Sequence, residues 1–119
     1  MIVIYSTLIL RILAPWFPSI AGITLFPFII LRKEIRDSAE AAITINHEKI
    51  HIRQQVELLV VFFAVWYIAS FLLGILRGLS WYEAYRGIIF EREAFDKMYD
   101  PGYLRERKIF AFMKYRNKG

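Results

Sequence analysis

The sequence predicts a mainly α-helical domain with a small β element, and three features support this fold class. Residues 58–76 form an uncharged apolar run of helix length. Two helix-start signals follow it, "SWYE" at residues 80–83 and "DPG" at residues 100–102. The stretch "GITLFPFIIL" at residues 22–31 is rich in β-branched and aromatic residues, which is typical of a strand. At 119 residues the chain has room for a single domain, which we expect to span residues 1–119.

The N-terminal third is apolar but interrupted by proline. Residues 1–31 carry one charge, Arg11, and three prolines, which argues against a straight transmembrane helix. We expect residues 2–13 to form a short interfacial or membrane-inserted helix. Because these residues lack the pattern of a cleavable signal peptide, we expect them to remain part of the working protein. Residues 22–31 should form an edge strand, because Pro27 cannot donate to a strand ladder. A membrane-dipping apolar hairpin is the alternative for the same residues.

A central helix is predicted after a charged surface loop or short helix at residues 32–42. From about Thr44 the polar pattern turns helical, and this helix should continue into the apolar run of residues 58–76. That run would span roughly 28 Å, close to a bilayer core of about 30 Å. It therefore has the length of a membrane span, although a buried central helix, or a helical hairpin broken near Gly74, would have the same composition.

Three shorter helices are expected toward the C-terminus. Ser80 and Glu83 have capping-box spacing, so a helix should begin at Trp81 and end near Gly87. A second helix should run from Glu91 to about Met98. The residues that follow supply an N-cap and a first-turn proline for a last helix that reaches about Tyr115.

The composition indicates an apolar partner. Apolar residues make up 57% of the chain and aromatic residues 17%, more than a domain of this size can bury. A membrane, a partner subunit or a second copy of the chain would cover the excess. The net charge of +5 suits anionic lipid headgroups. Nucleic acid is not an expected partner, because the basic residues alternate with acidic ones and no recognition motif is present. The chain has no cysteine, which excludes thiolate metal ligands.

The two histidines of the chain lie in one motif, "HEKIH" at residues 47–51. His47 and His51, four residues apart on a helix, share a face, so both imidazoles can bind one metal ion. Glu48 points about 100° around the helix, where it can take a proton from a metal-activated water. This is the HExxH pattern of zinc hydrolases. A solvated histidine pair beside Lys49 is the alternative interpretation.

Zinc sites of this kind need a third protein ligand. Glu57 lies about 9 Å from His51 along the helix axis, which is too far. In "FEREAFD", residues 90–96, Glu91 and Glu93 are two apart, so only one of them can face the histidines. Residue spacing alone leaves the choice between them open.

The combination of "HEKIHIRQQ" with a later helical "EREA" resembles the gluzincin metallopeptidases, including small membrane-associated bacterial types. The resemblance covers residues 43–57 and 90–96. It implies zinc held by His47, His51 and Glu91, with Glu48 as the general base and a location at the bacterial inner membrane. Several relatives have, where this chain has Phe95, an Asp that orients one of the histidine ligands, and this role stays unassigned here. The resemblance also implies that the strand at residues 22–31 binds extended peptide along its edge.

The return of the chain to the histidines constrains the fold. A straight helix over residues 51–76 would end about 37 Å from the metal. Either part of residues 78–90 is extended, with "RGIIF" the expected piece, or the long helix bends or ends early. In both cases the site should lie beside the polar end of the apolar helix, near the headgroup layer.

The predicted function is that of a membrane-associated zinc metallohydrolase, most specifically a peptidase that acts on a peptide or protein substrate. Candidates for stabilising an oxyanion are, by residue type alone, Tyr85, Tyr99, Tyr103 and Arg92. The alternative is a non-catalytic membrane scaffold or binding protein with a structural or vestigial metal site. Substitution of Glu48 would separate the two, because only the enzyme needs a base.

Overall fold

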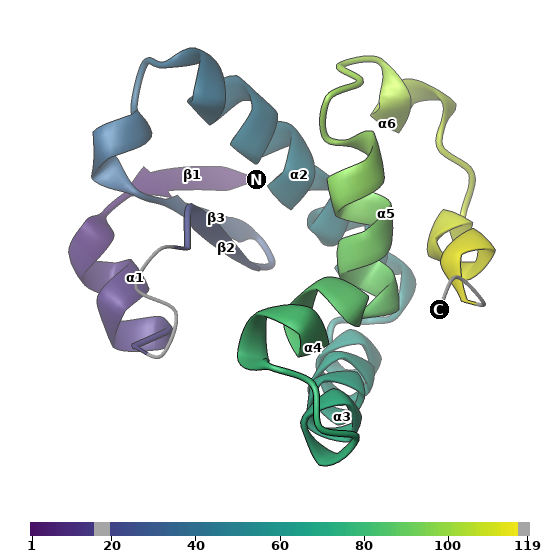
Figure 1. Ribbon diagram of the computed structural model, residues 1–119. Helices are drawn as coiled ribbons and strands as arrows, with labels where there is room; N and C mark the ends of the chain where they lie inside the picture. Colours follow the sequence, from purple (N-terminus) through teal and green to yellow (C-terminus); the bar gives the residue numbers. More distant parts are fainter. Residues whose placement is uncertain (16–19, 117–119) are drawn as a thin grey trace.

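The computed structural model describes residues 1–15 and 20–116 and is mainly helical with one small sheet, as the sequence predicts (Figure 1). The elements in chain order are β1 (Ile2–Tyr5), α1 (Thr7–Leu13), β2 (Gly22–Leu25), β3 (Phe28–Leu31), the 3-10 helix η1 (Lys33–Ile35), α2 (Ala39–Glu57), α3 (Val61–Leu76), α4 (Trp81–Gly87), α5 (Ile89–Lys97), α6 (Tyr103–Glu106) and the 3-10 helix η2 (Ala111–Tyr115). Helix α2 passes over the sheet, and α3 and α4 extend away from it.

The sheet has the strand order β1-β3-β2, with β1 parallel and β2 antiparallel to β3. The single strand expected at residues 22–31 is therefore a hairpin. Pro27 follows a cis peptide bond in its turn, where its missing N–H costs no ladder bond. The edge position predicted for this segment holds for β2 and is wrong for β3, which is central. Residues 2–5, expected to start a helix, form the other edge because three of them are β-branched.

Helix α2 begins five residues earlier than the expected start at Thr44. Ser38 caps it by accepting a hydrogen bond from the N–H of Ala41. Its inner face buries Ala41 and Ile52 against Ile29 and Leu31 of the central strand. This contact places the histidine motif above the sheet.

The chain bends sharply between α2 and α3, so the expected continuous helix is interrupted. The direction of the helix axis changes by 115° from α2 to α3. Leu59 and Val60 both have a φ of 58°, a left-handed conformation that no α-helix contains. Of the two routes that the sequence left open for the returning chain, the bend is the one adopted. The "RGIIF" segment is helical apart from one extended residue, Ile88.

Across residues 1–15 and 20–116, no helix taken alone combines the length and the apolar character that crossing a bilayer requires. Helices α2 and α3 pass that test only as a bent pair.

The C-terminal third confirms two helix predictions and corrects one. The Ser80–Glu83 capping box is formed, and α4 ends at Gly87 as expected. Helix α5 also lies where it was predicted. The expected last helix is wrong: α6 is only four residues long, and η2 follows after a break. The cause lies at Arg107, whose extended backbone carries its side chain into buried ion pairs with α2 and α5.

Gly74 offers a test of the packing between α3 and α4. A Cβ at Gly74 would lie 2.9 Å from Cβ and 3.1 Å from Cα of Ala84, whereas a Cβ at Gly87 would meet nothing within 4 Å. Alanine favours a helix over glycine by about 1 kcal/mol at both sites. We expect Gly74→Ala to lower the free energy of unfolding by about 1–2 kcal/mol despite this gain, and Gly87→Ala to leave it unchanged or higher. Chemical denaturation measures both, and equal effects would contradict the close helix contact.

Candidate metal centre

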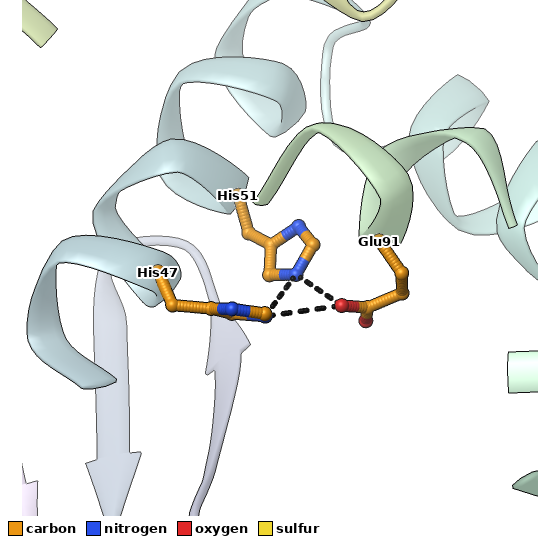
Figure 2. A group of neighbouring side chains, drawn as sticks. All are labelled: His47, His51 and Glu91. Carbon is orange, nitrogen blue, oxygen red and sulfur yellow. Dashed lines mark hydrogen bonds and ion pairs between the residues drawn. The ribbon is translucent and has the colours of Figure 1, made fainter. Parts of the chain in front are cut away.

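Three buried side chains converge between α2 and α5 (Figure 2). The Nε2 atoms of His47 and His51 lie 3.2 Å apart, and each lies 3.0 Å from Oε1 of Glu91. Each of the three residues is 4% exposed. The structure thus brings together the two histidines of the motif and Glu91, the carboxylate that the gluzincin resemblance selects over Glu93.

The spacing of these three atoms fits a divalent cation. Ligands at about 2.0–2.1 Å from one tetrahedral ion are separated from each other by roughly 3.3 Å. The separations of 3.0 to 3.2 Å are close to this value. All three atoms can offer a lone pair to the same point, and a fourth position would stay open for a non-protein ligand. The group could therefore hold a metal ion.

Gln54 sets the tautomer of His51. Its Nε2 donates to the carbonyl of Phe90 and to Glu93, which turns its Oε1 toward Nδ1 of His51 at 2.7 Å. The proton of a neutral His51 must therefore sit on Nδ1. A neutral His51 therefore presents the lone pair of Nε2 to the position that an ion would occupy between the three atoms.

His47 and Glu91 are oriented in the same manner. Nδ1 of His47 lies 3.3 Å from the sulfur of Met98, a weak acceptor, and the ring packs edge-on against Phe95. The hydroxyl of Tyr67 donates to Oε2 of Glu91 at 2.6 Å, so that Oε1 is the oxygen that faces the histidines. Phe95 thus packs against a ligand ring at the position where the gluzincin resemblance expects an Asp.

Glu48 lines two cavities whose walls also contain the three candidate ligands. The larger, of about 470 Å³, is lined by His47 and Glu48 and is called here the His47 cavity. The smaller, of about 340 Å³, is lined by Glu48, His51 and Glu91 and is called the His51 cavity. Oε2 of Glu48 accepts a 2.6 Å hydrogen bond from Thr24 of β2. The carboxylate is thereby fixed at the wall that both cavities share.

The other acidic candidates are engaged elsewhere. Glu93 is fully buried. Its carboxylate accepts a 2.6 Å hydrogen bond from Nε of Arg107 and another from the hydroxyl of Tyr103. Glu57 binds the same guanidinium through both oxygens. Asp96 accepts from the hydroxyl of Tyr115. These carboxylates stabilise the fold around the ligand group and are not members of it.

Of the four oxyanion candidates, the structure places Tyr85 at the wall common to both cavities. Burial, with the Glu91 carboxylate nearby, raises the pKa of its hydroxyl, which therefore stays protonated. Tyr99 lines only the His47 cavity. Tyr103 donates to Glu93, and Arg92 donates to the carbonyl of Tyr115. Tyr85 is thus the one of these four residues that lines both cavities.

Sequence reasoning missed Tyr67, Thr24 and the role of Gln54. Gln54 carried a local signal, because it lies three residues after His51 on the same helix face. Tyr67 and Thr24 carried none, since both reach the site through the tertiary fold.

The metal-free site holds a proton. Burial lowers the pKa of His51, but the Glu91 carboxylate raises it by more, to about 9. Burial raises the pKa of Glu91, while the two imidazoles lower it by more, to well below its usual range. At neutral pH the group therefore contains an imidazolium paired with a carboxylate.

Comparisons of the chain with protein-family models, with curated proteins and with solved structures found no match.

Metal affinity should depend on pH through His51. Because the pKa of His51 is higher in the folded protein than in the unfolded chain, the proton bound to His51 stabilises the fold. This contribution is complete below about pH 6.5 and is lost as the pH rises through about 9. A cation must displace that proton. We expect the apparent affinity for Zn²⁺ to rise about tenfold per pH unit from pH 7 and to level off near pH 9, measured by competition with a chromophoric chelator. An affinity that is flat between pH 7 and 8.5 would contradict this protonation state.

Substitution of Glu91 and substitution of Glu93 should have different effects on metal affinity and on stability. Glu91→Gln removes a ligand, so metal affinity should fall at least about a hundredfold, and the metal-free protein should also lose stability at neutral pH because the buried imidazolium of His51 loses its partner. Glu93→Gln leaves Arg107 paired with Glu57 alone, which should cost about 1–3 kcal/mol of unfolding free energy and leave metal binding in place. Isothermal titration with Zn²⁺ and chemical denaturation of both variants test this contrast. The assignment is reversed if Glu93→Gln loses metal while Glu91→Gln retains it.

Proposed function

We propose that this protein is a metal-dependent hydrolase, most specifically a zinc peptidase of the gluzincin type. The observation that carries the proposal is the position of Glu48, a buried carboxylate between His47 and His51 in the chain that lines both cavities together with the ligand residues. A ligand group without an adjacent base would serve only to hold an ion. Here a base, an ion site and space for a substrate lie together.

The chemical roles follow from the site. A bound divalent ion would polarise a carbonyl and make water a better nucleophile at neutral pH. Glu48 would take the proton from that water and return it to the leaving amine. Thr24 holds this carboxylate through Oε2, so Oε1 would be the oxygen that takes the proton. The protonated hydroxyl of Tyr85 would donate to the oxyanion.

Zinc is the proposed ion on the basis of its ligands. Two imidazoles and one carboxylate are a common catalytic zinc set, and the spacing of the three atoms suits a tetrahedral ion. In this proposal α2 supplies the motif, α3 is the apolar helix that follows it and α5 supplies the third ligand. The bacterial inner membrane that the gluzincin resemblance implies is part of the same proposal.

Strand β2 favours an extended peptide as substrate. It forms an edge of the sheet, and its first residue, Gly22, lines both cavities. Further along β2, the side chain of Gln55 occupies the outer edge of the strand. Its amide donates to the carbonyl of Thr24 and accepts from the N–H of Phe26. Substrate pairing is therefore proposed at the Gly22 end of the strand, beside Glu48.

Glu48→Gln tests the function. The change keeps the size of the side chain but removes its basicity, so turnover should fall by at least about a thousandfold while Zn²⁺ binding is retained. Fluorescein-labelled casein and a quenched fluorescent peptide library serve as probes, and zinc content is measured on the same samples. Glu106→Gln, an exposed glutamate on α6 that lines neither cavity, is the matched control and should retain turnover.

Wild-type protein that binds zinc but cleaves neither probe would instead support the scaffold alternative. Cleavage that survives in Glu48→Gln would overturn the assigned base.

A further inference from the structure

Helix α3 exposes an apolar surface that the fold leaves in contact with solvent. Val61, Val65, Ile68 and Leu72 form one line along the helix, called here the α3 stripe, and are 66%, 62%, 57% and 53% exposed. Phe62, Leu73 and Leu76 are exposed beside it. All of α3 is uncharged. Exposed apolar patches of this extent mark interaction surfaces.

The α3 stripe also borders the His51 cavity. Ile68 belongs to the stripe and lines the cavity, and Ala64, one helical turn before it, does the same. Leu13 at the end of α1 and Leu25 at the end of β2 are two further lining residues that are exposed. The rim of the cavity beside the ligand group is thus apolar and continuous with the surface of α3.

Cations flank this surface at both ends. Beyond the last turn of α3 lies the exposed Arg77, followed at the start of α4 by the half-exposed rings of Trp81 and Tyr82. The carboxylate of the nearby Glu83 is held in its capping box by the N–H of Ser80. Apolar residues framed by aromatic rings and cations are the composition of a membrane-contacting face.

The other end of the surface is reached through aromatic contacts. Trp66 packs edge-on against Phe112, which packs in the same way against Phe110. Phe110 and Ile109 are exposed, and the exposed cations Lys108 and Lys114 adjoin them in the chain.

We propose that the α3 stripe and the rim of the His51 cavity dock onto an anionic lipid bilayer, so that the cavity opens toward the lipid. The protein would lie in the interface, with α3 immersed to the level of its flanking cations. The cavity would then admit an apolar side chain or acyl chain that is presented by the bilayer. This choice of ligand rests on the proposed function, whereas docking itself does not.

A second copy of the chain is the rival occupant, and charge disfavours it. A symmetric pair of α3 helices, parallel or antiparallel, would bring cationic ends together. Anionic lipid neutralises both ends at once, at about a fivefold gain in affinity for each cation near the surface.

Vesicle sedimentation tests the docking, with the Glu48→Gln protein used throughout so that turnover plays no part. Vesicles of phosphatidylcholine with 30% phosphatidylglycerol should bind the protein, and pure phosphatidylcholine should bind it more weakly. The triple change Val65→Ser, Ile68→Ser and Leu72→Ser should weaken binding at least about tenfold. Ile2→Ser, a comparably exposed site on β1, is the matched control and should not.

Variants with fewer positive charges test the docking independently. Lys108→Gln with Lys114→Gln should weaken binding to the anionic vesicles by about tenfold or more and remove much of its salt dependence. The exposed control Lys33→Gln, on η1, should leave binding unchanged.

The absence of cysteine in the sequence permits clean labelling of the cavity rim. An environment-sensitive fluorophore at Ala64→Cys or Ile68→Cys should shift to the blue on vesicle binding and be quenched by nitroxide lipid, whereas one at Ile2→Cys should not. Unaffected rim labels on bound protein would overturn the orientation. Vesicle binding that the serine and glutamine variants leave intact, or a dimer in sedimentation velocity that the serine variant dissociates, would overturn the docking.

Discussion

The bend between α2 and α3 determines the rest of the structure. A straight continuation would carry the chain away from the histidines, whereas the turn at Leu59 and Val60 redirects it by 115°. The redirected helix brings Tyr67 to Glu91, and Phe63 into the aromatic cluster that supports α5. Two left-handed residues without glycine are conformationally costly. The packing that they allow must offset this cost.

A buried polar network then sets the register of α5 on α2. The amide of Gln54 bridges the two helices, and Glu93 accepts from it and from Arg107. The described part of the chain contains no buried side-chain N or O atom without a hydrogen-bond partner. Because a buried charge tolerates little displacement from its partner, Glu93 fixes the rotation of α5. That rotation is what points Glu91, two residues earlier, at the imidazoles.

The sequence predicted what depends on local spacing. The histidine pair, the adjacent glutamate and the capping box at Ser80 each involve residues within one or two helical turns of one another. In the structure the first two lie on one helix, α2, and the capping box begins α4. The choice of Glu91 over Glu93 came from a resemblance, since spacing alone could not decide it. The structure decides it through Arg107, which lies fourteen residues beyond Glu93 and pairs with it.

The errors share one physical cause. The hairpin at residues 22–31, the break after α2 and the short α6 all replace a longer regular element with two shorter ones. In each case a tertiary contact overrides local propensity, such as the pairing of β2 with β3 or the burial of Arg107. Tyr67 and Thr24 were missed for the same reason, since each reaches the site from an element distant in sequence.

Gln54 has a further consequence because it serves two partners at once. One end of its amide fixes His51, and the other holds Glu93, whose guanidinium partner anchors the segment that carries η2. The orientation of the His51 ring and the attachment of the C-terminal segment therefore depend on the same side chain. A substitution of Gln54 would disturb both regions at once, although they lie on different elements of the fold.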